Sequence, residues 1–220
     1  TRVLVSAAAL TIAVAAVIAV VNAPEPEPSR PGPTQVAPAA ASPNIRLREG
    51  GHSLAQAPAG SPVLVEFVDL ESEASRRAEP VMAKVRTDYD GRVNFVTRFF
   101  VPTDKHANAK NAALAVEAAA AQGRLEPMIS RMFQTQADWA ELDDSKAPLF
   151  RQFAQELGLD MARYDADVAS PVVRNRVEDD RGDARALEVA DTPALFLDGK
   201  KIDPKSEEGL RQLLDAAMTR

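Results

Sequence analysis

Two serines three residues apart, Ser72 and Ser75, stand where a predicted strand gives way to a predicted helix. The run from Val63 to Asp69 is apolar enough for a buried strand, and from Ser72 onward the apolar residues recur at helical spacing. Unpaired amides and a partial positive charge at a helix N-terminus favour reactive or anionic groups there. The tetrad Ser72, Glu73, Ala74 and Ser75 is therefore the first candidate for a reactive site.

Serine at this junction has a structural and a chemical interpretation. Serine is a preferred helix N-cap, and Glu73 in the first turn interacts favourably with the helix dipole, so capping is the favoured interpretation. A serine nucleophile needs a base within hydrogen-bonding reach, and His52 and His106 are the only histidines in the sequence. Two separated histidines without any cysteine do not form the ligand spacings of a zinc site, so no metal site is predicted.

The tetrad and its surroundings resemble the DsbA-like branch of the thioredoxin superfamily. Members of that family carry a strand, a short aromatic and acidic turn, and a Cys-x-x-Cys motif that opens a helix. Residues 63–80, VLVEFVDLESEASRRAEP, follow this order with serine in both cysteine positions. Pro80 falls five residues after Ser75, where the family commonly has a helix-kinking proline, and Thr192-Pro193 matches the family's cis-proline.

Two further motifs extend the resemblance to a helical insert that the family carries. His106-Ala107-Asn108-Ala109 is similar to the start of the first insert helix, and the pair Gln136 and Trp139 is similar to a motif near the second. The resemblance covers about residues 61–217. It implies an α/β, thioredoxin-like fold with the insert at about 103–170, in which neither histidine points clearly at the Ser72 turn.

The resemblance also implies a site for peptides. In relatives the cis-proline faces the active site and exposes backbone groups that pair with an extended substrate chain, which makes Asp191, Thr192 and Pro193 the candidate peptide-binding residues. We expect the Thr192-Pro193 bond to be cis.

The same loop would bring Asp191 close to three acidic residues around the tetrad, namely Asp69, Glu71 and Glu73. Burial of such a group would raise the pKa of one carboxyl, as acid–base catalysis requires. Exposed acids beside a helix N-terminus are more often plain dipole partners, which is the favoured interpretation here.

The chain contains no cysteine, so thiol–disulfide exchange has no nucleophile. Our first hypothesis is therefore a redox-inactive module that binds peptides or another envelope protein, in the manner of a chaperone. The alternative is a thiol–disulfide oxidoreductase whose two cysteines were replaced by serine in an engineered form, although Glu73 stands where many relatives have proline. Whether the chain is an enzyme stays open between the two, and we expect no cofactor.

The N-terminal region predicts the location. Residues 3–21 form an uncharged apolar run of 19 residues, which as a helix spans about 28 Å, close to the thickness of a bilayer. We expect residues 1–21 to be a transmembrane anchor or an uncleaved signal, with a cleaved signal peptide as the alternative. Residues 22–43 contain seven prolines and predict an extended linker, followed by one domain over 44–220.

Arg2 before the run and Glu25 and Glu27 after it predict a single-pass protein of the cell membrane with its domain on the extracytoplasmic side. The expected partners are the membrane, through the N-terminal helix, and an extracytoplasmic protein or peptide. A net charge of −6 argues against nucleic acid, because binding to phosphates needs a basic surface.

Periodicity and turn residues predict the remaining elements. The central unit is a parallel βαβ unit with strands 63–69 and 92–100 around helix 72–88. A type I′ turn at Asp198-Gly199 joins the last two strands. Expected strands are 45–48, 194–197 and 200–202, and expected helices are 106–122, 125–137, 146–157, 161–169, 171–189 and 206–218.

Overall fold

A computed structural model of the protein describes residues 51–102 and 104–219. The predicted anchor, the linker and the strand at 45–48 lie outside this range. Within it, every helix is too short or too polar to cross a bilayer.

The domain is built on a five-stranded sheet in the order β1-β3-β2-β4-β5. Strands β2 and β3 run parallel, and the other neighbouring pairs are antiparallel. Both central strands are buried along their whole length, as strands covered on two faces must be. The strands are β1 (His52–Ala55), β2 (Val63–Val68), β3 (Asn94–Phe99), β4 (Ala194–Leu197) and β5 (Lys200–Ile202).

Strand β1, residues 52–55, was not among the strands expected from the sequence. These four residues pair antiparallel with β3, with His52 opposite Thr97. Their sequence, HSLA, has no strong strand periodicity, so the pairing with β3 rather than local pattern accounts for the strand.

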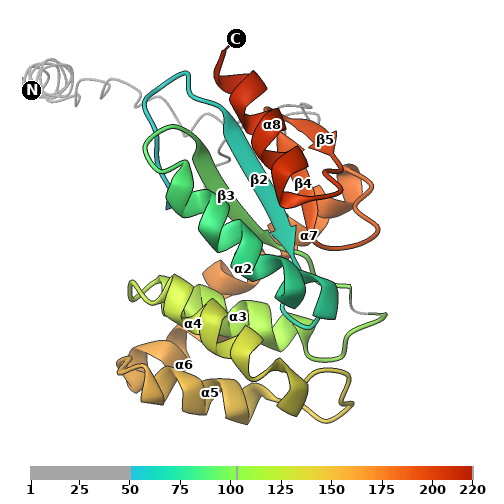
Figure 1. Ribbon diagram of the computed structural model, residues 1–220. Helices are drawn as coiled ribbons and strands as arrows, with labels where there is room; N and C mark the ends of the chain where they lie inside the picture. The colour runs from blue at the N-terminus through green and yellow to red at the C-terminus, as the bar shows by residue number, and fades with distance from the viewer. Residues whose placement is uncertain (1–50, 103, 220) are drawn as a thin grey trace, which may run out of the picture. The chain divides into compact units, whose positions relative to one another are not determined.

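Helices cover both faces of the sheet (Figure 1). Helix α2 (Glu73–Asp88) and helix α8 (Glu207–Met218) lie on one face, where their apolar side chains pack on Leu64 and Phe95. Helix α7 (Pro171–Ala186) packs on the other face, against Val65 and Phe196.

The predicted insert forms a helical subdomain at the end of the sheet where β2 and β3 finish (Figure 1). Its core surrounds the alanine-rich helix α3 and includes Trp139 and Phe150, whose rings meet edge to face with centroids 4.9 Å apart. Val68 and Phe99, at the strand ends, belong to the same core and join the insert to the sheet. Its elements are α3 (Ala109–Ala120), α4 (Leu125–Gln134), the short 3-10 helix η1 (Gln136–Asp138), α5 (Ala147–Glu156) and α6 (Met161–Ala169).

Most predicted elements are found within a few residues of their expected ends, and the type I′ turn is confirmed by positive φ angles at Asp198 and Gly199. The predicted helix 106–122 starts only at Ala109, because the backbone and side chain of Asn108 are engaged by neighbouring segments. The predicted helix 171–189 ends at Ala186, before Glu188 adopts a positive φ.

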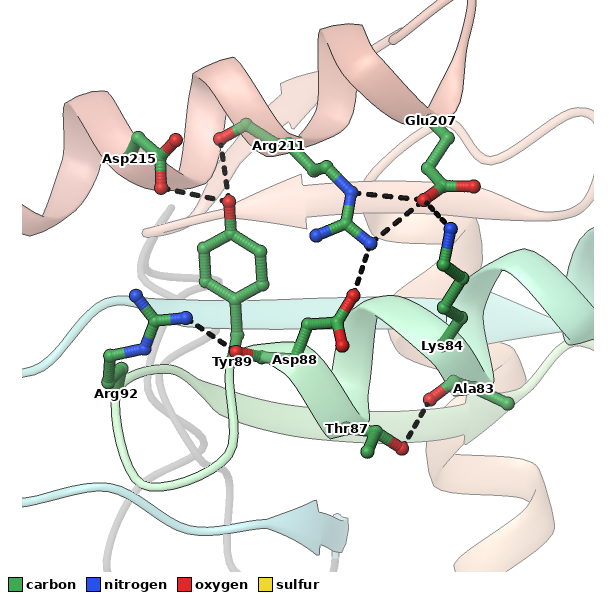
Figure 2. A network of polar contacts seen from close by, with 9 residues as sticks. All are labelled: Ala83, Lys84, Thr87, Asp88, Tyr89, Arg92, Glu207, Arg211 and Asp215. Carbon is green, nitrogen blue, oxygen red and sulfur yellow. Dashed lines mark hydrogen bonds and ion pairs between the residues drawn. The ribbon is translucent and has the colours of Figure 1, made fainter.

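A polar network fixes α8 to the end of α2 (Figure 2). The buried Tyr89 donates its hydroxyl to Oδ1 of Asp215 at 2.8 Å and to the carbonyl of Arg211 at 3.3 Å. The guanidinium of Arg211 in turn binds Asp88 and Glu207, so both helices share one set of charges.

A buried ion pair joins β3 to α7 on the other face. Arg98 Nε donates to Asp180 Oδ1 at 2.6 Å, and the second carboxylate oxygen accepts from the Phe99 amide at 2.9 Å. Asp183 binds Arg98 Nη2 at 2.7 Å. Both charges of the Arg98–Asp180 pair are compensated and hydrogen-bonded, which is what makes their complete burial tolerable.

Candidate functional site

Ser72 is the N-cap of α2. Its backbone is extended, and its Oγ accepts a hydrogen bond from the Ser75 amide at 3.4 Å. The predicted cap is confirmed, and no histidine hydrogen-bonds to Ser72 in the part of the chain that the structure describes. Pro80 lies inside the helix, as predicted from the resemblance.

Ser75 is buried in the first turn of α2, with 2% of its surface exposed. Its Oγ has no hydrogen-bond partner among the described residues. A hydroxyl without a partner is poorly suited to a buried position, whereas a sulfur or a methyl group loses little there.

The turn before the helix is held by two buried carboxylates. Asp69 Oδ1 accepts from the Glu71 amide at 2.9 Å, and its Oδ2 lies 2.5 Å from Nδ1 of His106 in a hydrogen-bonded pair. Glu71 accepts from the backbone amides of Asn108 and Glu141, at 2.8 and 3.0 Å. Residues of the helical insert therefore hold the turn in place through hydrogen bonds to both carboxylates.

The electrostatics of the turn follow from these contacts. The hydrogen bond that His106 donates to the Asp69 carboxylate raises the pKa of His106, and partial burial of the ring opposes that effect. Burial raises the pKa of Glu71, although the two backbone amides counteract the rise. Both groups are engaged, so neither is a free acid or base aimed at Ser72.

The four acidic residues that the sequence analysis considered together do not form one buried cluster. Glu73 is exposed and pairs with Arg77 at 2.6 Å, one helical turn away. Asp191 is 92% exposed, and its nearest recorded cation is Lys105 at 3.9 Å. Only Asp69 and Glu71 are brought together by burial, because they lie on the turn that the insert covers.

His106 and Gln136 have a role that the sequence analysis missed. His106 was not expected to point clearly at the Ser72 turn, and it makes no hydrogen bond to Ser72 but pairs with Asp69, three residues before it. Gln136 donates its side-chain amide to the carbonyls of Leu70 and Ser72. The helix predicted over 125–137 therefore ends before this residue, as α4 at Gln134. The family motifs around both residues were the available signal; their contacts join segments 37 and 66 residues apart.

The Thr192-Pro193 bond is cis, as predicted. Pro193 lines a groove of about 350 Å³ together with Ala78 and Val81 of α2 and with residues of β4, β5 and α8. Asp191 does not line this groove, so of the three candidate peptide-binding residues only Pro193 contributes to it.

Other chemistry finds little support around the tetrad. Within residues 51–102 and 104–219, no group of three or more histidine or acidic side chains is arranged to hold a metal ion. The turn offers a capped helix N-terminus, a tied pair of carboxylates and an adjoining groove, but no activated nucleophile.

The sequence profile of a protein family described as Thioredoxin matches residues 55–216, most of the chain. The chain belongs to the thioredoxin family. This member has the DsbA-like form of the fold, as solved structures show. A thioredoxin-like oxidoreductase from Silicibacter pomeroyi DSS-3 is 23% identical, with a TM-score of 0.63 over 79% of this chain and 95% of that one. DsbA from Xylella fastidiosa is 18% identical, with a TM-score of 0.63 over 74% of this chain and 88% of that one. The α-DsbA1 of Wolbachia pipientis is 16% identical, with a TM-score of 0.67 over 81% of this chain and 96% of that one.

Curated relatives of this thioredoxin-family chain are named as Na(+)/H(+) antiporters. The Na(+)/H(+) antiporter NhaA 1 of Mycobacterium sp. (strain KMS) is 35% identical over 144 residues, which are 63% of this chain and 22% of the antiporter. The NhaA of Herminiimonas arsenicoxydans is 33% identical over 143 residues, 63% of this chain and 21% of that protein. The similarity thus concerns a segment of about a fifth of each antiporter's length.

Proposed function

We propose that this protein is a redox-inactive, DsbA-like binding module, anchored in the cell membrane, which holds an extended peptide or a segment of another envelope protein on the extracytoplasmic side. The observation that carries the proposal is the pair of serines at the start of α2. Ser72 uses its oxygen as a helix cap, and Ser75 is buried.

Loss of redox chemistry follows from the reaction itself. Thiol–disulfide exchange proceeds by attack of a thiolate and passes through a mixed disulfide. The chain has no cysteine to supply either sulfur, and a serine hydroxyl cannot form that intermediate.

The groove beside Pro193 supports the binding role. Its lining includes the apolar side chains of Val81 and Met82 from α2, Leu195 from β4 and Leu210 from α8. Lys205 and Glu207 supply charge at the same groove. Sites for extended segments commonly combine an apolar floor with a few polar groups that fix orientation.

The membrane setting is supported by the sequence before the domain and by the relatives. The apolar run at residues 3–21 has the length of a bilayer span, and the proline-rich linker would hold the domain clear of the surface. The antiporters in which a similar segment occurs are named as ion transporters, which fits a module that works beside membrane proteins.

Redox inactivity is tested with the full-length protein in insulin reduction and in oxidation of a reduced model peptide. We expect neither rate to exceed the control without protein, because no thiolate is present. The matched positive control is the Ser72→Cys/Ser75→Cys double variant, which restores the family motif. Turnover by the protein without cysteine would contradict the proposal.

Binding is tested by fluorescence anisotropy with fluorescein-labelled, reduced and carboxymethylated α-lactalbumin, a permanently unfolded chain. We expect saturable binding that Val81→Lys weakens by about tenfold or more, or 1.4 kcal/mol, by placing a charge in the groove. Val172→Lys, on the exposed surface of α7, serves as the control and should change nothing. No binding, or equal binding by both variants, would refute a peptide role for this groove.

A further inference from the structure

A second cavity lies away from the Pro193 groove, between the sheet and helices α2 and α4. It has a volume of about 360 Å³, within the usual range for small-molecule sites, and it shares no lining residue with that groove. Glu66, in the middle of the central strand β2, faces into it.

The Glu66 carboxyl makes no ion pair with a described residue. Only 6% of the residue is exposed, and no described residue donates a hydrogen bond to it. Its neighbours along β2 are all apolar, so a charged residue at this position costs free energy unless something compensates it. Burial, together with the nearby Glu79, raises the pKa of Glu66 to about 8, and the charge of Arg86 offsets only part of that rise.

The one cation among the residues that line the cavity, Arg86, makes no ion pair with Glu66, and its charge lowers the Glu66 pKa by less than burial raises it. Helix α2 contributes Glu79 and Arg86, and helix α4 contributes Glu126. Arg86 is already shared, with Nη2 at 3.7 Å from Glu79 Oε1 and 3.3 Å from Glu126 Oε2. The other lining strands, β1 and β3, add only the uncharged Leu54 and Thr97.

We propose that this cavity binds a small aliphatic ammonium ion, with the charged nitrogen on the Glu66 carboxylate and the alkyl stem against the apolar wall. That wall is formed by Val68, Ile129 and Phe133. An ammonium is a compact donor with three hydrogens, and it fits a single carboxylate flanked by a second acid. A bare metal ion does not fit as well, because three or more ligating side chains do not converge anywhere in the described chain.

Proton balance gives this site a signature. The ammonium pairs with the ionised carboxylate, so at neutral pH the proton that Glu66 holds must leave to solvent as the ligand enters. An alkylammonium keeps its own proton until about pH 10.4, as lysine does. Binding should therefore release up to one proton and tighten as the pH rises towards the pKa of Glu66.

The test is titration calorimetry of the full-length protein with n-butylammonium chloride, at constant ionic strength and in two buffers of different ionisation enthalpy. We expect affinity to rise about fifty-fold from pH 6 to pH 8, with proton release at pH 7. The neutral isostere 1-butanol should bind at least about tenfold more weakly and without pH dependence.

Variants separate this site from general surface attraction. Glu66→Gln should weaken butylammonium binding by about tenfold or more and remove its pH dependence, whereas the exposed Glu208→Gln on α8 should bind like the parent protein. Carbon-13 NMR of the Glu66 carboxyl in the unmutated protein, with and without ligand, gives an answer even if the Gln variant unfolds. A bound ligand should lower its pKa. Equal binding of butanol and butylammonium, absent binding, or an unchanged Glu66 titration would overturn the proposal.

Discussion

Ser75 carries a buried hydroxyl with no hydrogen-bond partner among the described residues, which is costly for the fold. Ser75→Ala removes that group, and alanine is also the better helix former. We expect the variant to be more stable by about 1 kcal/mol, since an unpaired buried polar group costs roughly 1–3 kcal/mol. Urea denaturation followed by circular dichroism measures the change.

The control is Ser72→Ala, one helical turn earlier. That substitution removes the oxygen that accepts from the Ser75 amide, so it should destabilise the protein by about 1 kcal/mol. A gain in stability for Ser75→Ala and a loss for Ser72→Ala would show that the Ser72 hydroxyl stabilises the fold and that the Ser75 hydroxyl does not. A loss of stability in Ser75→Ala would mean that its hydroxyl has a partner after all.

At the scale of elements, Tyr89 links helices α2 and α8 (Figure 2). Tyr89→Phe keeps the buried ring but loses the hydrogen bonds to Asp215 and to the Arg211 carbonyl. We expect a loss of about 1–2 kcal/mol in the free energy of unfolding, near the low end of the range of about 1.5–3 kcal/mol for a hydrogen bond to a charged group, because Asp215 is exposed. Chemical denaturation at low salt is the measurement.

Tyr164→Phe is the matched control, because Tyr164 is equally buried but no hydrogen bond of its hydroxyl to a described residue is recorded. It should change the free energy of unfolding by less than about 0.5 kcal/mol. If the two Tyr→Phe substitutions changed the free energy of unfolding equally, the network between α2 and α8 would contribute nothing to stability.

At the scale of the whole molecule, buried acids set how stability depends on pH. The pKa of Glu66 rises from its ordinary value of 4.5 to about 8 on folding, so its stabilising effect is complete below pH 4.5 and is lost as the pH rises to about 8. The pKa of His106 is also raised, so its contribution falls in the same direction, above about pH 6.5. The domain should therefore be more stable at pH 5 than at pH 8.

In Glu66→Gln the free energy of unfolding should differ less between pH 5 and pH 8 than in the parent protein, by up to about 4 kcal/mol, because glutamine does not titrate. Thermal melts of both proteins across that range, without amines in the buffer, provide the comparison. Glu208→Gln should keep the parent slope. An unchanged slope in Glu66→Gln would mean that the carboxyl stays ionised in the folded protein.

Local rules were enough for much of the fold. The ends of α6, β4 and β5 match their predicted bounds, and α8 begins one residue after the Ser206 cap. The turn at Asp198-Gly199 follows from the two residues that tolerate positive φ. The tetrad was predictable for the same reason, since a cap and its helix are close in sequence.

Tertiary structure decided the rest. β1 becomes a strand because β3 offers it a free edge, and His106 reaches Asp69 across 37 residues. Among the described residues, Glu66 lacks a direct ion pair because of which helices cover β2 and because Arg86 forms its ion pairs with Glu79 and Glu126 instead. A sequence shows that a charge interrupts an apolar strand, but only packing determines whether that charge finds a partner, because both its burial and its neighbours come from segments distant along the chain.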